Sequence, residues 1–217
     1  MKMKFIISLC AFLTAALAYS DSPLTSTYFA KYCGADAVIQ VYKEKGFSEE
    51  LMQFLSSPKE NPIHKIALIN EISWGSDQYV KGYEAYLIAN KKGITTAVFE
   101  ALKADKGTQK ELYKITKTLS ADELMSWAYL QALGDYFHPA EAFKAATLAH
   151  NRMKEKSMAH ATVYALIRCQ IAFDQSWCEV YRVGDEYLRV RNYKTNRLSA
   201  EAVSTILEYL DLYKEDC

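Results

Sequence analysis

Glycine and proline are scarce in this chain, and neither sign of charge is in excess. Only 8 of the 217 residues are glycine and 4 are proline, which argues against a fibrous or low-complexity chain. The 26 basic residues are matched by 26 acidic ones, whereas nucleic-acid-binding proteins usually carry a basic excess. Half of the residues are hydrophobic, as in ordinary globular proteins. We therefore expect a folded protein with no nucleic-acid partner.

The sequence also lacks short motifs of common enzymes and cofactor sites. It contains no H-E-x-x-H, no G-x-S-x-G and no C-x-x-C, and its glycines are too scattered for a phosphate-binding loop. We therefore expect no metal, no cofactor and no nucleophile of a known motif. Four histidines remain as candidates for chemistry. One of them is predicted at a helix start, and two others, His150 and His160, are predicted on adjacent helices, close enough in sequence to approach each other. The four are His64, His138 (three residues before Glu141), His150 and His160.

A long apolar run occurs only at the N-terminus. Lys2 and Lys4 precede an uncharged run from Phe5 to Leu17, and Ala16–Ala18 supplies an A-x-A cleavage site. This order predicts a signal peptide over residues 1–20; the alternative is a buried N-terminal helix. The run is short for a membrane span, and no later segment reaches that length. We expect export to the periplasm or the extracellular space, without stable membrane insertion after cleavage.

Cleavage would leave four cysteines, and an even number in an exported chain is typical of two disulfides. Three pairings are possible. We favour Cys169–Cys178, which would join the end of one helix to the start of the next, together with Cys33–Cys217, which would join the first mature helix to the C-terminus. Such bonds contribute a few kcal/mol to stability, by a mechanism that is disputed. The alternative is four free thiols.

The mature chain is predicted to form a series of helices. Apolar residues recur at helical spacing, alternating strand patterns are missing, and helix-start signals follow one another closely. The signals are Ser48, Asn61-Pro62, Thr108-x-x-Glu111, Ser120-x-x-Glu123 and Ser199. Residues 21–217 are predicted to form a single all-α domain of about eleven helices. Its antiparallel helical hairpins would stack as a repeat-like superhelix or as an irregular bundle.

One segment resembles a known repeat family. Leu133-Gly134-Asp135-Tyr136, followed by Ala142 and Ala149, is similar to the middle of a tetratricopeptide unit. Helix starts near Ser76, Thr108 and Pro139 lie 32 and 31 residues apart, close to the period of that family. The resemblance covers one partial unit and implies a concave surface that binds protein or peptide. Any antiparallel helical bundle gives a similar spacing.

Tyrosine is unusually frequent, with 16 copies. Tyrosine presents a large amphipathic surface at low entropic cost and is therefore common in recognition sites. Two groups are candidates for a contact surface, and one of them is rich in arginine. The groups are Tyr79, Tyr83 and Tyr86 on one helix face, and Tyr181, Arg182, Tyr187, Arg189 and Arg191 near the C-terminus. The alternative is that these tyrosines fill seams between helices.

These observations favour an exported, non-catalytic helical protein that binds another protein, such as an inhibitor, an immunity protein or an envelope assembly factor. The alternative is a small secreted helical hydrolase that acts on an envelope or extracellular polymer. That alternative requires a cleft in which His138, Glu141 and His150 converge.

Overall fold

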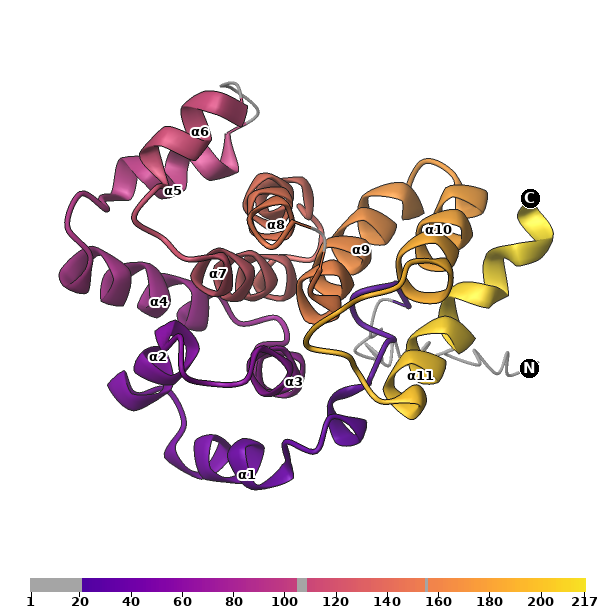
Figure 1. Ribbon diagram of the computed structural model, residues 1–217, viewed down its shortest axis with the longest axis horizontal. Coiled ribbons are helices and arrows are strands. Elements are labelled where there is room, and N and C mark those ends of the chain that lie inside the picture. The colour runs from indigo at the N-terminus through magenta and orange to yellow at the C-terminus, as the bar shows by residue number, and fades with distance from the viewer. Residues whose placement is uncertain (1–20, 105–108, 155) are drawn as a thin grey trace, which may run out of the picture.

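The computed structural model describes residues 21–104, 109–154 and 156–217, and the predicted signal peptide lies outside these ranges. The described chain is all-α and contains eleven α-helices, as the sequence predicts, with adjacent helices packed against each other (Figure 1). The helices are α1 (Asp36–Lys45), α2 (Glu49–Ser56), α3 (Pro62–Ile72), α4 (Asp77–Asn90), α5 (Thr96–Lys103), α6 (Gln109–Ile115), α7 (Ala121–Gly134), α8 (Ala140–Arg152), α9 (Met158–Phe173), α10 (Trp177–Gly184) and α11 (Ala200–Leu210). Three short elements complete the set: η1 (Ala30–Tyr32), η2 (Asp185–Val190) and η3 (Asp211–Asp216).

Helix α7 lies at the centre of the molecule (Figure 1). It packs against α2, α3, α4, α8 and α9, and every residue from Glu123 to Leu133 is buried. A helix with neighbours on all sides needs apolar side chains around its whole circumference. The sequence provides them with Leu124, Trp127 and Leu130 among others, so α7 forms the axis around which the other helices are placed.

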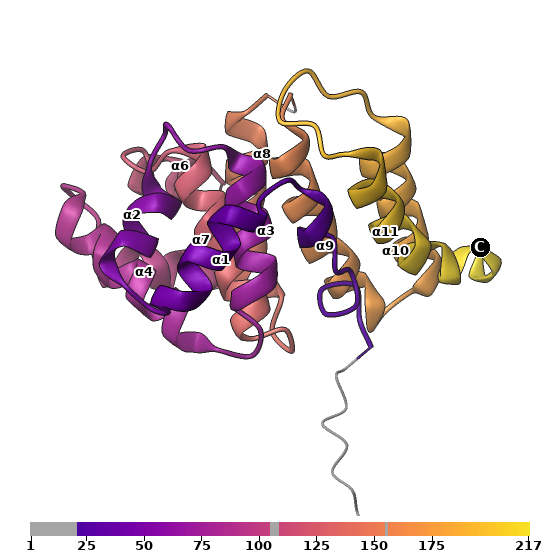
Figure 2. The ribbon, with the colours of Figure 1, turned by 90° about the horizontal axis from the view of Figure 1, so that it is seen from below.

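The two halves of the chain pack differently. In the C-terminal half, consecutive helices from α7 to α10 are neighbours, and the small residues Ala142, Ala146 and Ala149 of α8 are buried in this stack. Small side chains allow close approach of helix backbones. In the N-terminal half, α1 packs on α3 and α2 packs on α4. A view from below shows α1 and the segment before it crossing the face of α3 (Figure 2).

Several predicted helix starts are confirmed. Ser48, Asn61 and Ser199 each accept a hydrogen bond from a backbone N–H of the helix that follows. Ser120 and Glu123 form the complete capping box, in which each side chain bonds the other residue's backbone N–H. Thr108, the first residue of the other expected capping box, lies outside the described residues.

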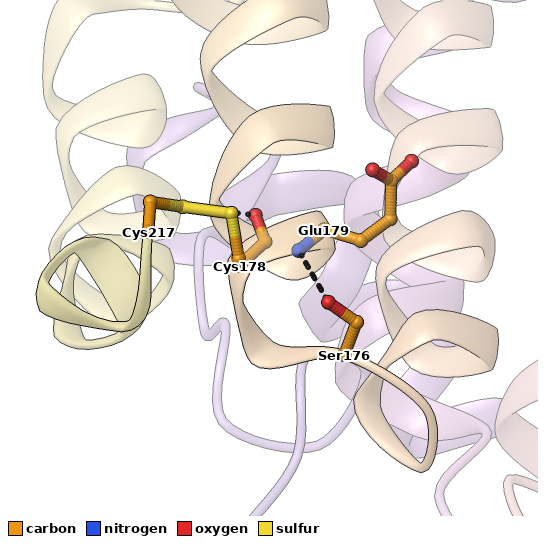
Figure 3. Close-up of a disulfide and its surroundings, with 4 residues drawn as sticks. All are labelled: Ser176, Cys178, Glu179 and Cys217. Atoms are coloured by element: carbon orange, nitrogen blue, oxygen red, sulfur yellow. Dashed lines mark hydrogen bonds between the residues drawn. A yellow bond between two sulfur atoms is a disulfide. The ribbon is translucent and has the colours of Figure 1, made fainter.

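The predicted disulfide pairing is wrong. Cys178 is bonded to Cys217 (Figure 3), with a Cα–Cα distance of 4.8 Å, whereas Cys33 and Cys169 are free thiols. The pairing differs because Cys169 and Cys178 lie on different sides of the α9–α10 pair. Cys169 is buried on α9, where its thiol donates to the carbonyl of Val180 at 3.4 Å. The C-terminal η3 packs on α10 instead, and this contact brings Cys217 to Cys178.

Candidate functional site

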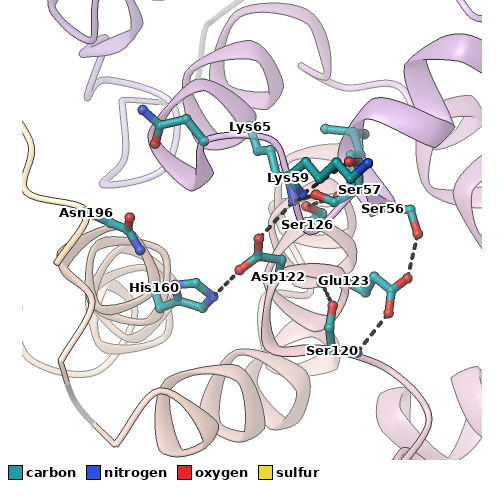
Figure 4. A network of polar contacts seen from close by, with 12 residues as sticks. Ser56, Ser57, Lys59, Lys65, Ser120, Asp122, Glu123, Ser126, His160 and Asn196 are labelled. Carbon is teal, nitrogen blue, oxygen red and sulfur yellow. Dashed lines mark hydrogen bonds and ion pairs between the residues drawn. The ribbon is translucent and has the colours of Figure 1, made fainter.

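A network of buried charged groups joins four helices near the centre of the molecule (Figure 4). Asp122, at the start of α7, lies 2.9 Å from the Lys65 ammonium of α3 and 3.2 Å from His160 Nε2 of α9. Lys65 also donates to the carbonyl of Ser57, just after α2, at 2.6 Å. The side chains of Lys65 and His160 are fully buried. Asp122 therefore holds α3 and α9 against the start of α7.

The protonation of Asp122 follows from these partners. Burial alone raises its pKa, because a low-dielectric surrounding penalises the charged form. The contacts with His160 and Lys65, together with the positive charge of Lys65, outweigh burial and hold the pKa of Asp122 below its usual range. Asp122 is therefore an anion at neutral pH, which matches its role as the acceptor of this network.

Glu123, the next residue, makes a second buried anchor. Its carboxylate accepts hydrogen bonds from the Ser56 hydroxyl at 2.5 Å and from the Ser120 backbone N–H at 2.8 Å, and it pairs with Lys91 at 2.8 Å. Burial raises the pKa of Glu123, but these donors bring it below its usual range. Two adjacent carboxylates thus fasten different neighbours of α7.

Ser157, His160 and Asp122 are the residue types of a hydrolase triad, but the two imidazole nitrogens of His160 are exchanged relative to that triad. His160 Nδ1 is 2.8 Å from the Ser157 hydroxyl, and Asn196 donates to the same hydroxyl at 2.9 Å. However, Ser157 is fully buried and His160 is 1% exposed, so a substrate cannot reach the serine. The residues after η2 cover it, because Thr195 and Asn196 accept the first backbone N–H groups of α9. This arrangement fastens the start of α9 and offers no catalytic cleft.

The residues required by the hydrolase alternative do not converge. His138 is exposed and pairs with Asp135 at 2.8 Å, an interaction that raises the pKa of its imidazole. Glu141 accepts a hydrogen bond from Gln131. His150, by contrast, is buried at the far end of α8, where its ring stacks on Tyr164 at 5.0 Å. The expected cleft around His138, Glu141 and His150 is therefore not formed.

The first predicted tyrosine group is divided between core and surface. Tyr83 is fully buried in α4, so it contributes to the core and is unavailable for contact. Tyr79 and Tyr86 are half-buried. Tyr79 packs against the ring of Phe47, and Tyr86 lines a shallow hollow at the start of α2. The prediction of a contact surface is thus corrected at Tyr83, because α4 is covered on that side by α7.

In the second predicted group, the residues of η2 and the arginine after it make their contacts within the molecule. Tyr187 is buried in η2, a π-helical turn that continues α10, and the Arg191 guanidinium covers its ring at 4.1 Å. Arg191 pairs with Glu186, and Arg189 pairs with Asp185 and Asp211. Tyr187 is therefore a core residue, a second correction, and the two arginines are already neutralised by carboxylates.

Tyr181 and Arg182, the other two residues of the second predicted group, do not form one surface with the tyrosines of α4. Tyr181 is half-buried and Arg182 is exposed, both on α10. Figure 1 places α10 and α4 at opposite ends of the molecule. The structure therefore does not bring the two predicted groups together.

Helix α6 carries a different candidate surface, which the sequence reasoning missed. Lys110, Lys114 and Lys117 follow one another at i, i+4 and i+7, a spacing that places them on one side of the helix and the turn after it. Tyr113 and Ile115 are 57% and 38% exposed on the same short helix. This lysine spacing is visible in the sequence, but the exposure of the apolar pair is not. We call these five residues the α6 face.

Two hollows flank the α6 face. One, of about 460 Å³, lies between α6 and the start of α5 and is lined by Lys92, Lys114 and Lys117 together with Ile115. The other, of about 400 Å³, lies between α6 and the end of α8. Its lining includes Lys110, Tyr113, Arg152 and Lys154. Among the described residues that line either hollow, every charged side chain is a cation.

Five described lysines, all outside the α6 face, form ion pairs. The lysine ion pairs within the described chain use Lys43, Lys65, Lys81, Lys91 and Lys103. Arg152, in contrast, is a structural residue, since it donates to Thr116 Oγ1 at 2.8 Å and to the carbonyl of Leu119. The α6 face is thus a positive patch on a rigid support.

Comparisons with known proteins gave no relative: no family model, no curated protein and no solved structure matches the chain. The tetratricopeptide resemblance therefore stays a prediction. Within the described residues, no group of three histidine, cysteine, aspartate or glutamate side chains is placed to hold a metal ion. None of the helices described is long and apolar enough to cross a membrane.

Proposed function

We propose that this chain is an exported, non-catalytic helical protein that binds an acidic segment of another protein through the α6 face. Export rests on the predicted signal peptide of residues 1–20 and on the Cys178–Cys217 disulfide, a bond that persists in oxidising compartments. The predicted repeat-like stacking of helical hairpins also supports a binding role, because stacked hairpins present extended surfaces to a partner.

The observation that carries the proposal is the combination of charge and exposed apolar area around α6. Lysines alone are the ordinary surface of a soluble protein. Here Lys110 lines one hollow together with Tyr113, and Lys114 and Lys117 line the other together with Ile115. Both apolar side chains are exposed, and tyrosine is among the residues that dominate binding energy at interfaces. Lysines at i and i+4 repel each other by about 0.2–0.5 kcal/mol, so an acidic partner relieves an unfavourable interaction as well as making new ones.

The test is a binding experiment with a charge-reversed variant. Oxidised protein lacking residues 1–20 is used to capture proteins from the envelope and culture medium of its source, at low and at high salt. The Lys114→Glu/Lys117→Glu variant is compared with Lys45→Glu/Lys194→Glu, which reverses two exposed lysines elsewhere. We expect one stoichiometric acidic partner that is lost from the α6 variant, kept by the control and weakened by salt.

Two results would contradict the proposal. A partner that the α6 variant retains places the interface elsewhere on the molecule. Failure to recover any partner, with folded protein verified by circular dichroism, removes the support for a binding function. A further variant, Tyr113→Ala, separates charge from apolar contact, because it leaves the lysines in place and should still weaken binding about tenfold or more.

A further inference from the structure

A second hollow, remote from the α6 face, opens where α9, α10 and η3 meet. Its volume is about 280 Å³, and its lining combines aromatic rings with short polar side chains. These are Phe173, Asp174, Gln175, Ser176, Trp177 and Asp216. The mixture differs from that of the lysine-lined hollows around α6, because its charged members are two carboxylates.

Trp177 is the most conspicuous residue of this hollow. It is 53% exposed, whereas the other two tryptophans are anchored by their indole N–H groups, Trp127 to Glu84 at 3.0 Å and Trp74 to the carbonyl of Asn70. Trp177 lies 6.0 Å from the ring of Tyr213. Its ring is therefore supported by a neighbour and still has a large area open to a ligand, which suits stacking.

The polar groups stand next to this open ring. Asp174 and Gln175 belong to the short connection between α9 and α10, and Asp216 ends η3; all three are exposed. The ion pairs of this region use Glu179 and Asp211 instead of these two aspartates. Carboxylate oxygens accept hydrogen bonds, and an amide both donates and accepts, so the set matches a ligand rich in hydroxyl groups.

The disulfide holds the two sides of the hollow together. Cys178 is the second residue of α10, and Cys217 is the last residue of the chain, directly after Asp216 (Figure 3). The bond thereby keeps Asp216 beside the start of α10, opposite the connection that bears Asp174. The position of Asp216 relative to the start of α10, and with it the geometry of the hollow, therefore depends on this bond.

We propose that this hollow binds a neutral saccharide. A sugar ring would stack on Trp177, and its hydroxyl groups would donate to Asp174 and Asp216 and exchange hydrogen bonds with Gln175. Two carboxylates and no lining cation disfavour acidic sugars. They are also few for a calcium site, which takes six to eight oxygen ligands. This site is independent of the protein-binding function proposed for the α6 face.

The three indole N–H signals of the ¹⁵N-labelled, oxidised protein provide the test. Cellotetraose, chitotetraose, maltotetraose and, as an acidic probe, tetragalacturonate are titrated separately. We expect one of the neutral saccharides to shift the Trp177 signal, leaving the Trp74 and Trp127 signals in place, with a dissociation constant on the order of 1 mM or tighter. Calorimetry then compares variants with this saccharide.

The variants separate the site from the fold. Trp177→Ala and Asp216→Ala should each weaken binding about tenfold or more, and Cys178→Ser/Cys217→Ser should weaken it as well. Phe137→Ala, which removes an exposed aromatic ring outside both proposed sites, serves as the matched control and should bind normally. No shift of Trp177 with any neutral saccharide would overturn the proposal. So would stronger binding of tetragalacturonate, or a shift that requires added calcium.

Discussion

The Lys65 ammonium of α3 lies 2.9 Å from the Asp122 carboxylate of α7, and the lysine side chain is entirely buried. The buried ammonium has lost its hydration, which is unfavourable for folding. The stability of the fold therefore depends on the hydrogen bonds and the opposite charge that the protein offers to this ammonium. Asp122 and the carbonyl of Ser57 provide that compensation, and His160 shares the same carboxylate. This one aspartate therefore connects the N-terminal helices with the C-terminal ones.

Removal of the Asp122 carboxylate should be strongly destabilising. Asp122→Ala leaves the Lys65 charge buried without its partner, and breaking a buried pair in this way costs about 3–5 kcal/mol. The measurement is urea denaturation followed by circular dichroism. Glu71→Ala is the control, since it breaks the more exposed Lys43–Glu71 pair and should cost at most about 1 kcal/mol. Equal effects of the two substitutions would contradict the structural role of Asp122.

Stability should fall in acid because of the same carboxylates. Asp122 and Glu123 have pKa values below their usual range in the folded protein, so the folded state binds protons less readily than the unfolded state. Their contribution is complete above the unfolded pKa, about 4, and is lost as the pH falls through the lowered folded values. Denaturation between pH 2 and pH 7 should show this loss.

The pH dependence can be assigned to a residue. Asp122→Asn should flatten part of the acid slope of the unfolding free energy, because asparagine does not titrate. Asp77→Asn, which changes an exposed carboxylate paired with Lys81, should leave the slope nearly as it is. If both variants kept the full wild-type slope, the acid sensitivity would arise from other carboxyl groups.

The two free thiols should be unreactive while the protein is folded. Burial raises the pKa of the Cys33 thiol to about 12, and it raises the pKa of Cys169 further. The thiolate is the reactive form, so neither cysteine should be alkylated by iodoacetamide at pH 8 without denaturant. Peptide mapping by mass spectrometry after denaturation should find both labelled, with Cys178 and Cys217 in one crosslinked species. A Cys33–Cys217 crosslink would contradict the structure.

Gly184 should tolerate alanine poorly. A Cβ atom there would lie 2.5 Å from Leu210 Cδ1, and Leu210 is fully buried at the end of α11. Overpacking of this kind costs about 1–3 kcal/mol, measurable as a shift in the thermal midpoint. Gly82→Ala is the matched control. Its Cβ would meet the ring of Phe47, which is 49% exposed and has room to swing outward, so its effect should be smaller. The reverse order would contradict this account of the packing.

Local patterns were sufficient for the helices and insufficient for the site. The starts of α2, α3, α7 and α11 follow from Ser48, Asn61, Ser120 and Ser199, because a capping hydrogen bond spans two or three residues. The lysine spacing of α6 can likewise be recognised in the sequence. Its neighbour Tyr113 could not be recognised as exposed, because burial depends on whether another helix covers that side.

The sequence by itself determined the all-α class and where most helices begin, since helical periodicity and capping act over a single turn. Only the tertiary structure decided that Cys178 meets Cys217, 39 residues away, and that Tyr83 and Tyr187 belong to the core. It also decided that His160 contacts Asp122. These outcomes depend on which helix faces meet, and that choice is made by the packing of the whole chain around α7.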